Sequence, residues 1–345
     1  LGDHGRNARD RILRIETNAG IEGVGSCFAS KEDAGRLIGR DPLDFWRPGT
    51  GIESPLGRGD APLIDLIGRF LDKPAWLLFG GFGPERVPAY DGSIYFADLI
   101  PEHASRPIER ILEEVDHALA RGHRGFKVKV GRGAKWMERE AGFARDVEVV
   151  RAILKHVGPK VRVGVDANNG MDLETTKRFI DAVEGELWFV EEMFPEKVEE
   201  DLALKAFLRE RGLSTLVADG ESAHENAHFD PFIEHRALDV LQGDIRTFGF
   251  TLLRELSRRT AQTPIRLAPH NWGSYLGLFM QLTLGRGIPN FLVAEEDPGK
   301  SGLFDAEGFE LRDGAFSVPD APGLGVRLRA DRLADLANHE WTVEA

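Results

Sequence analysis

The sequence contains a single cysteine, Cys27, so no disulfide can form within the chain, which agrees with a reducing compartment. No apolar run approaches the roughly 20 residues that a membrane-spanning helix needs, which excludes a helical membrane protein. Basic residues are outnumbered, because 44 Lys and Arg stand against 57 Asp and Glu for a net charge of -13. Nucleic-acid binding requires clustered cations, and none are visible. We therefore expect a cytoplasmic protein with neither a membrane nor a nucleic acid as partner.

The chain starts at Leu1 with LGDHGRNARD, which offers neither an initiator methionine nor the apolar core of a signal peptide. We therefore expect the natural protein to have residues upstream of Leu1. The 345 residues exceed one ordinary domain and suit a large α/β barrel with a smaller second domain.

The first part of the sequence predicts an α+β domain. Residues 11–28 favour two strands joined by a turn at 18–20, because apolar residues recur on both sides of Asn-Ala-Gly. A short helix is predicted over 31–40, and the Gly- and Pro-rich stretch 41–60 is predicted as loop. Apolar residues at helical spacing predict a helix from Ala61, ended by Lys73-Pro74. We place the boundary of this capping domain at residue 86.

From residue 87 the pattern changes to alternating strands and helices. The eight predicted strands lie near 87–91, 125–130, 161–166, 187–192, 215–219, 238–242, 265–269 and 290–294. Between them run helical patterns, such as those stopped by Gly122 and Gly158. Eight such units predict a (β/α)8-type barrel over 87–310, with its active site at the C-terminal strand ends. The Gly- and Pro-rich segment 311–345 leaves the repeat and is expected to return to the capping domain.

Carboxylates end three consecutive predicted strands: Asp166, Glu191 and Glu221. Three converging carboxylates repel one another unless a cation neutralises them, and a set of oxygen ligands suits Mg²⁺. The alternative is that each carboxylate caps the following helix. The sequence therefore predicts a magnesium site in the barrel mouth. At the fifth strand Asp219 is also available beside Glu221.

Lys127 and Lys129 alternate on one face of the second strand, so both point into the barrel or both point out. Close to a metal and to each other, they would have lowered ammonium pKa values, which suits a general base. The alternative is a pair of solvated lysines at the end of a strand.

Asp244 ends the sixth strand and His270 the seventh, so the carboxylate could hold the imidazole in one tautomer. This pair would be a second acid/base group. A histidine followed by Asn271 is more often structural, so the pair is a hypothesis. At the eighth strand Glu295 or Glu296 could donate a proton to a substrate oxygen.

Taken together, the motifs resemble the enolase superfamily, specifically its mandelate racemase-like branch. The resemblance is carried by GIEGVG (20–25), APLIDLIGR (61–69), KPAWLLFGG (73–81), KVK (127–129), VDANN (165–169), FVEE (189–192), ADGES (218–222), LQGDIRTFGFT (241–251), APHNWGS (268–274) and PGLG (322–325). It implies an α+β capping domain on a modified barrel, Mg²⁺ as cofactor and a homo-oligomer. In this family the capping domain and an N-terminal loop select the substrate.

The resemblance also implies roles for the candidate residues. Mg²⁺ would be held by Asp166, Glu191 and Glu221, while Lys129 is one base, Lys127 lies near the substrate carboxylate, and Asp244 with His270 is the other acid/base group. Two departures are visible: Phe248-Gly249-Phe250 stands where the family commonly has paired glycines, and two residues separate the FVEE glutamates from the proline that usually follows them.

We expect an Mg²⁺-dependent acid-sugar dehydratase that removes the proton α to a carboxylate. Family chemistry of this kind proceeds through an enediolate, with a Lys or His base. Polar residues near the strand ends would bind a small hydroxylated carboxylate, namely Asn168, Lys127, Arg246 and His224, with Trp272 lining the pocket. The alternatives are a racemase or epimerase of a 2-hydroxy acid and a metal-binding barrel without catalysis.

Overall fold

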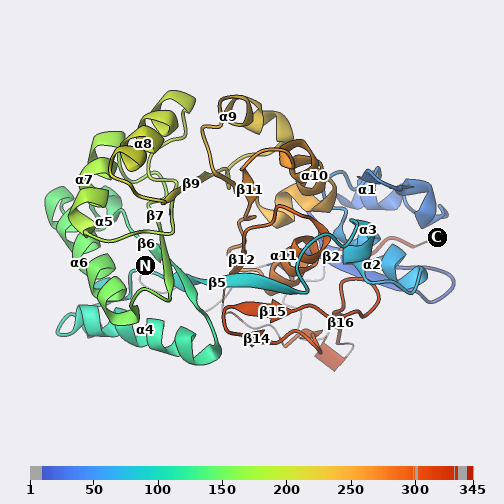
Figure 1. Cartoon of the computed structure of the whole chain (residues 1–345). Helices are drawn as coiled ribbons and strands as arrows, with labels where there is room; N and C mark the ends of the chain where they lie inside the picture. The colour runs from blue at the N-terminus through green and yellow to red at the C-terminus, as the bar shows by residue number, and fades with distance from the viewer. Residues whose placement is uncertain (1–9, 298, 300–301, 330, 333–339, 345) are drawn as a thin grey trace.

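The computed structural model describes residues 10–297, 299, 302–329, 331–332 and 340–344 (Figure 1). The capping part begins with the antiparallel hairpin β1 (Ile12–Glu16) and β2 (Glu22–Ser26), as predicted. Helix α2 (Ala61–Phe70) packs on it. A Cβ at Gly23 would lie 2.2 Å from the Pro62 carbonyl oxygen, so glycine is what allows strand and helix backbones to touch. The helix ends before the predicted Lys73-Pro74 stop.

The connection between hairpin and α2 is more structured than predicted. It contains α1 (Lys31–Gly35), η1 (Pro42–Phe45), β3 (Trp46–Arg47) and β4 (Gly51–Ile52), and α3 (Ala75–Leu78) follows α2. The helix predicted over 31–40 was too long, because after Gly35 the backbone continues in i→i−3 turns that end at Gly39 with φ +71°. The prediction of a loop over 41–60 was wrong where η1, β3 and β4 form, and the remaining residues lie outside these elements.

Eight parallel strands form the barrel. They are β5 (Arg86–Ile94), β6 (Gly125–Lys129), β7 (Arg162–Asp166), β8 (Phe189–Glu191), β9 (Leu216–Asp219), β10 (Val240–Leu241), β11 (Arg266–Leu267) and β12 (Ala294–Glu296). Each pairs with the next from β5 to β11, and β12 pairs with β5. A bridge from Leu267 to Phe291 closes the ring. The predicted (β/α)8-type fold with a capping region is therefore confirmed.

Helices surround this sheet in Figure 1. They are η2 (Ala97–Leu99), η3 (Pro101–His103), α4 (Pro107–Arg121), α5 (Arg132–Lys135), α6 (Arg139–Val157), α7 (Leu173–Val183), α8 (Val198–Glu210), η4 (Asn226–Phe229), α9 (Asp230–His235), α10 (Ile245–Thr260) and α11 (Tyr275–Gly287). The predicted stops are confirmed, since Gly122 caps α4 and Gly158 caps α6, both with positive φ.

The eighth strand was predicted too early, at 290–294. Phe291 makes only the single bridge to Leu267, and regular pairing begins at Ala294, where the chain meets β5. The apolar residues before Ala294 that suggested the strand are mostly buried, but they precede the regular pairing with β5. Because of this shift, both Glu295 and Glu296 lie within the strand rather than after it.

The barrel interior decides which strand residues face the site. Its buried cluster contains Tyr90, Phe189, Ala218, Val240, Ala268 and Val293. A Cβ at Gly164 would lie 2.5 Å from the Phe189 ring, so this glycine gives the ring its space. Alternation along the strand then puts Asp166 on the same inner face as Gly164.

The C-terminal segment contains β13 (Phe304–Asp305), β14 (Leu311–Arg312), β15 (Ala315–Ser317) and β16 (Arg327–Leu328). Strand β15 pairs antiparallel with the start of β5. Further on, Leu324 N donates to Asp65 Oδ1 of α2 at 2.7 Å and Ala75 N to the Gly323 carbonyl at 2.7 Å. The domain division itself stays a prediction. No helix in the described part of the chain combines the length and apolarity needed to cross a bilayer.

Candidate active site

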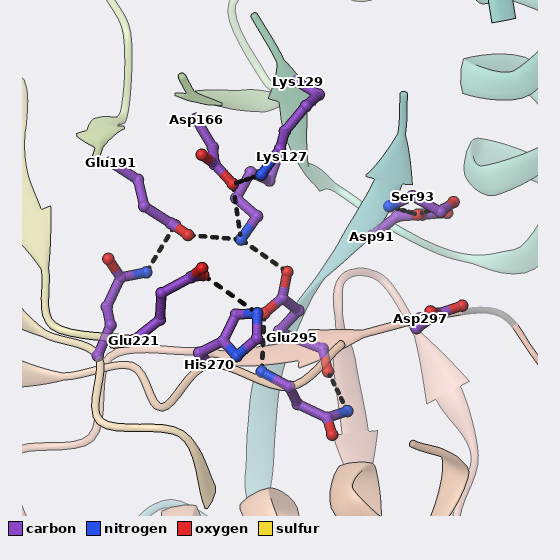
Figure 2. Close-up of polar contacts among 12 residues, drawn as sticks. Asp91, Ser93, Lys127, Lys129, Asp166, Glu191, Glu221, His270, Glu295 and Asp297 are labelled. Carbon is purple, nitrogen blue, oxygen red and sulfur yellow. Dashed lines mark hydrogen bonds and ion pairs between the residues drawn. The ribbon is translucent and has the colours of Figure 1, made fainter. Parts of the chain in front are cut away.

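A cavity of about 210 Å³ opens at the C-terminal ends of the barrel strands. Its lining residues are Gly92, Tyr95, Lys127, Lys129, Asp166, Asn168, Glu221, His270, Trp272 and Glu295. Figure 2 shows the charged side chains converging on one centre from separate strands. The strand-end residues that the sequence singled out are therefore brought together in space.

The three predicted metal ligands form one cluster. Asp166, Glu191 and Glu221 each offer an oxygen, and these oxygens lie within 4.8 Å of one another. Asp166 and Glu191 are buried, and Glu221 is half-buried. Burial raises the pKa of Glu191 to about 7, and the charges of neighbouring carboxylates add to the shift. Asp219, the alternative at the fifth strand, bonds to Gly220 N and lies outside this cluster.

Two lysines balance the charge of this cluster. Lys127 Nζ lies 2.7 Å from Glu191 Oε1 and 2.8 Å from Glu295 Oε1. Lys129 Nζ lies 2.5 Å from Asp166 Oδ2. Burial raises the pKa of Asp166, but the two ammonium groups outweigh that effect and lower it. Both lysines therefore point into the barrel mouth, which disfavours the solvated alternative.

The lysine pKa values differ from the sequence-based expectation, which had both lowered. Burial lowers the pKa of Lys127, but the charges of Glu191 and Glu295 outweigh it and raise the value well above the usual range. The same balance, with Asp166 as main partner, raises the pKa of Lys129. The expectation was wrong for this arrangement because carboxylates contact both ammonium groups at 2.5–2.8 Å and their charges outweigh the effect of burial.

His270 and Asp244 form the predicted pair, with His270 Nδ1 at 2.8 Å from Asp244 Oδ2. His270 Nε2 faces Glu221 Oε2 at 3.2 Å. Burial lowers the pKa of His270, but the hydrogen bond to Asp244 and nearby carboxylates raise it to about 9. Burial acts against ionisation of Asp244, yet His270 and Arg246 hold its pKa at about 2. The imidazole is therefore protonated at neutral pH and presents Nε2–H to the cavity.

The eighth strand presents Glu295 to the cavity and Glu296 away from it. Glu295 Oε2 accepts from Asn271 N at 2.9 Å, whereas Glu296 pairs with buried His123 at 2.5 Å. Burial raises the pKa of Glu295, but Lys127 and His270 outweigh it and lower the value. Glu295 is thus ionised and accepts hydrogen bonds, so the expectation that it donates a proton does not fit this arrangement.

The predicted substrate-binding residues divide into two groups. Asn168 and Trp272 line the cavity, as does Lys127. Arg246 and His224 are not among the described lining residues. Arg246 instead donates to Asp244 Oδ2 at 3.2 Å, and exposed His224 offers its carbonyl to Arg58. Sequence proximity to a strand end did not show these contacts, and a role of the two residues in substrate binding stays a prediction.

Three residues of the site were missed. Gln242 Nε2 donates to Glu191 Oε2 at 2.6 Å, and period-two alternation back from Asp244 could have found it. Tyr95 places its ring 5.6 Å from Lys129 Nζ. A Cβ at Gly92 would lie 2.4 Å from Glu295 Oε1. Gly92 and Tyr95 were overlooked because the first barrel strand was predicted to end at residue 91.

Comparisons with known proteins agree with this geometry. The family model described as enolase C-terminal domain-like matches residues 110–332. Arabinonate dehydratase of Saccharolobus solfataricus is 30% identical over 293 residues, covering 83% of this chain and 73% of that protein. D-galactarolactone cycloisomerase of Agrobacterium fabrum is 25% identical, covering 94% and 90%.

Among solved structures, galacturonate dehydratase from Geobacillus sp., complexed with D-galacturonate and 5-keto-4-deoxy-D-galacturonate, matches with a TM-score of 0.86 at 30% identity. The match covers 98% of this chain and 94% of that one. A mutant of galacturonate dehydratase from Geobacillus sp., complexed with Mg, matches equally well, with a TM-score of 0.86 at 31% identity over 94% of this chain and 86% of that one. The chain therefore belongs to the enolase superfamily, in its mandelate racemase/muconate lactonizing enzyme-like branch, as its motifs predicted.

Proposed function

We propose that the protein is an Mg²⁺-dependent hydro-lyase that dehydrates a small acid sugar to a 2-keto-3-deoxy acid. One observation carries the proposal: Lys129 and His270, the latter held by Asp244, line the same cavity as two carboxylates of the three-carboxylate cluster. The names of the similar dehydratases, which include arabinonate and galacturonate dehydratases, support the same reaction class.

Asp166, Glu191 and Glu221 fit a divalent cation. They offer three oxygens within 4.8 Å of one another, and hard oxygen ligands suit Mg²⁺. Gln242 Nε2 donates to Glu191 Oε2 and so orients this carboxylate, as residues that hydrogen-bond to metal ligands commonly do. When bound, Mg²⁺ supplies the positive charge that stabilises an enediolate. With these carboxylates engaged by the ion, less negative charge would face Lys129, which would favour the neutral amine that a general base needs.

Lys129 and His270 divide the proton transfers. Neutral Lys129 removes the α-proton of the substrate onto Nζ, and the electron pair forms the enediolate. His270 then donates its Nε2 proton to the β-hydroxyl, the β-carbon–oxygen bond breaks, and water leaves. The resulting enol takes up a proton and becomes the 2-keto acid. Lys127, held by Glu191 and Glu295, lies where it can pair with the substrate carboxylate.

A screen of aldonic, aldaric and uronic acids with Mg²⁺ tests the proposal. Keto acid is detected as its semicarbazone, and α-proton exchange is followed in D2O by NMR. We expect one acid sugar to yield keto acid, with the product abolished by EDTA and by Lys129→Ala. The matched variant Lys135→Ala, at the exposed last residue of the short helix α5, should keep the activity.

Other outcomes would assign a different function. Exchange without keto acid would favour the racemase or epimerase, and a new isomer without loss of water a cycloisomerase. Wild-type protein that gives no keto acid, exchange or isomer from any acid in the screen would favour a metal-binding barrel without catalysis. Keto acid formed unchanged by Lys129→Ala would exclude Lys129 as the base. The expected homo-oligomer and cytoplasmic location also remain predictions, to be checked by light scattering and by fractionation.

A further inference from the structure

Asp60, in the capping region, is a buried carboxylate that reaches into the catalytic half of the chain. It is 0% exposed. Its Oδ1 accepts from Phe250 N at 2.9 Å and its Oδ2 from Thr251 N at 2.7 Å. A second connection lies beside it, where Ile52 N donates to Thr251 Oγ1 at 2.9 Å. Helix α10 and the first part of the chain lie side by side in Figure 1.

These bonds meet α10 at a break. Gly249 has φ +70° and ψ −179° within the helix, so α10 consists of a first turn and a longer second segment. The first backbone N–H groups of a helix lack intrahelical acceptors. Asp244 supplies the first turn, accepting from Arg246 N at 2.9 Å and Thr247 N at 3.1 Å. Asp60, from a distant part of the sequence, caps the second segment in the same way by accepting from Phe250 N and Thr251 N.

The Phe-Gly-Phe departure from the family pattern coincides with this contact. A Cβ at Gly249 would lie 2.1 Å from the Arg58 carbonyl oxygen and 2.6 Å from Asp60 Oδ1. Phe248 is fully buried and packs against Phe229 at 5.9 Å between ring centroids. Gly249, the one glycine in this Phe-Gly-Phe segment, therefore lets Arg58 and Asp60 of the capping region approach the break in α10.

Asp244 of the catalytic pair is the N-cap residue directly before the first turn of α10. That turn is tied to the end of the seventh strand, because Ile245 N donates to the His270 carbonyl at 3.1 Å. Asp244 uses Oδ1 to cap the turn and Oδ2 to hold His270 Nδ1 at 2.8 Å. A shift of the break toward the cavity would move Asp244 away from the imidazole. Burial raises the pKa of Asp60 to about 6, so above neutral pH the carboxylate is ionised, which favours its place at a helix N-terminus.

We propose that Asp60 is a positioning residue for the His270–Asp244 pair: by anchoring the break in α10 it fixes the turn that orients the proton-donating imidazole. The inference rests on the proposed dehydratase function, in which His270 acts after Lys129. Asp60 is not among the described residues that line the cavity, and it acts through Asp244.

The variant Asp60→Asn tests this, because an amide oxygen can accept one of the two N–H groups but its NH2 cannot accept the other. In D2O we compare keto acid formed with deuterium in the recovered substrate. Proton removal by Lys129 should continue while loss of the hydroxyl slows, so the ratio of exchange to dehydration should rise about tenfold, a modest fraction of the effect of a misplaced catalytic group. Gly249→Ala, which pushes on the same contact, should raise the ratio as well.

Asp65→Asn is the matched control. Asp65 is equally buried in α2 and also accepts two backbone N–H groups, from Val24 at 2.8 Å and Leu324 at 2.7 Å, but it does not contact α10. It should lower thermal stability without changing the ratio. Parallel loss of both activities in Asp60→Asn, or the same ratio as in Asp65→Asn, would show a merely structural role and overturn the inference.

A substrate-independent measurement separates this result from failure of the proposed function. In protein labelled with ¹⁵N-histidine, the Nδ1–H signal of His270 should exchange faster with solvent in Asp60→Asn than in wild type or Asp65→Asn. An unchanged signal would overturn the positioning role even if no substrate were found. Keto acid absent from wild type, with the signal changed as expected, would instead count against the dehydratase alone.

Discussion

The carboxylate of Asp244 shows how a single side chain sets the chemistry of a neighbour. One oxygen caps a helix and the other holds His270, whose pKa stands at about 9. Strand-end position predicted this pair, because the C-terminal ends of parallel strands share one edge of a barrel. It did not predict that Arg246 turns back onto Asp244, since the direction of a long side chain depends on the helix that follows.

Asp244→Asn should move the alkaline limit of dehydration. His270 donates only while protonated, so wild-type activity should fall as the pH rises through about 9. Without the carboxylate charge the imidazole loses its proton at lower pH. We therefore expect the alkaline limb of the pH profile to shift to lower pH by about one to two units. At pH 8 the protonated fraction of His270 falls from about nine tenths to between about one half and one tenth, so the rate of keto acid formation should fall by about 2- to 10-fold. The pH profile of kcat measures this, with α-proton exchange as an internal control. An unchanged alkaline limb would contradict the role of Asp244.

At the scale of elements, alternation along the strands was the most informative feature of the sequence. It put Lys127 and Lys129 on one face, and their contacts with the carboxylate cluster show that this face is the inner one. Strand limits were less predictable, because they depend on which backbone groups find a partner. β5 runs to Ile94 rather than to residue 91, so Tyr95 directly after it was missed. β12 starts only at Ala294, four residues later than predicted.

Gly164→Ala tests the packing of β7 against β8. The added Cβ would lie 2.5 Å from the Phe189 ring, which is 2% exposed and wedged among other aromatic rings. Overpacking of this kind costs about 1–3 kcal/mol of unfolding free energy, and we expect that loss in denaturant titrations. Gly35→Ala is the control, since its Cβ would meet Val343 only at an ordinary 3.7 Å. Equal stability of the two variants would show that the ring relocates freely.

At the scale of the whole molecule, the order of strands and the place of the site followed from the sequence, whereas the joining of its two halves did not. The barrel repeats a local unit that periodicity reveals. The contacts of Asp60 with α10 and of Asp65 with Leu324 connect residues far apart in sequence, and no local pattern encodes them. Such long-range bonds show why the capping region and barrel should unfold together.

Metal binding should stabilise this whole structure, because a ligand that binds only the folded state raises its stability by mass action. At 100 times the dissociation constant the gain is about 2.7 kcal/mol. We therefore expect Mg²⁺ to raise the melting temperature by several degrees and EDTA to reverse the change. Glu221→Gln should abolish the shift, since it removes one of three clustered ligands. Asp219→Asn, two residues earlier at the end of β9 but outside the cluster, should retain it. Equal shifts in both variants would mean that Mg²⁺ acts elsewhere, because the cluster loses a charged ligand only in the first.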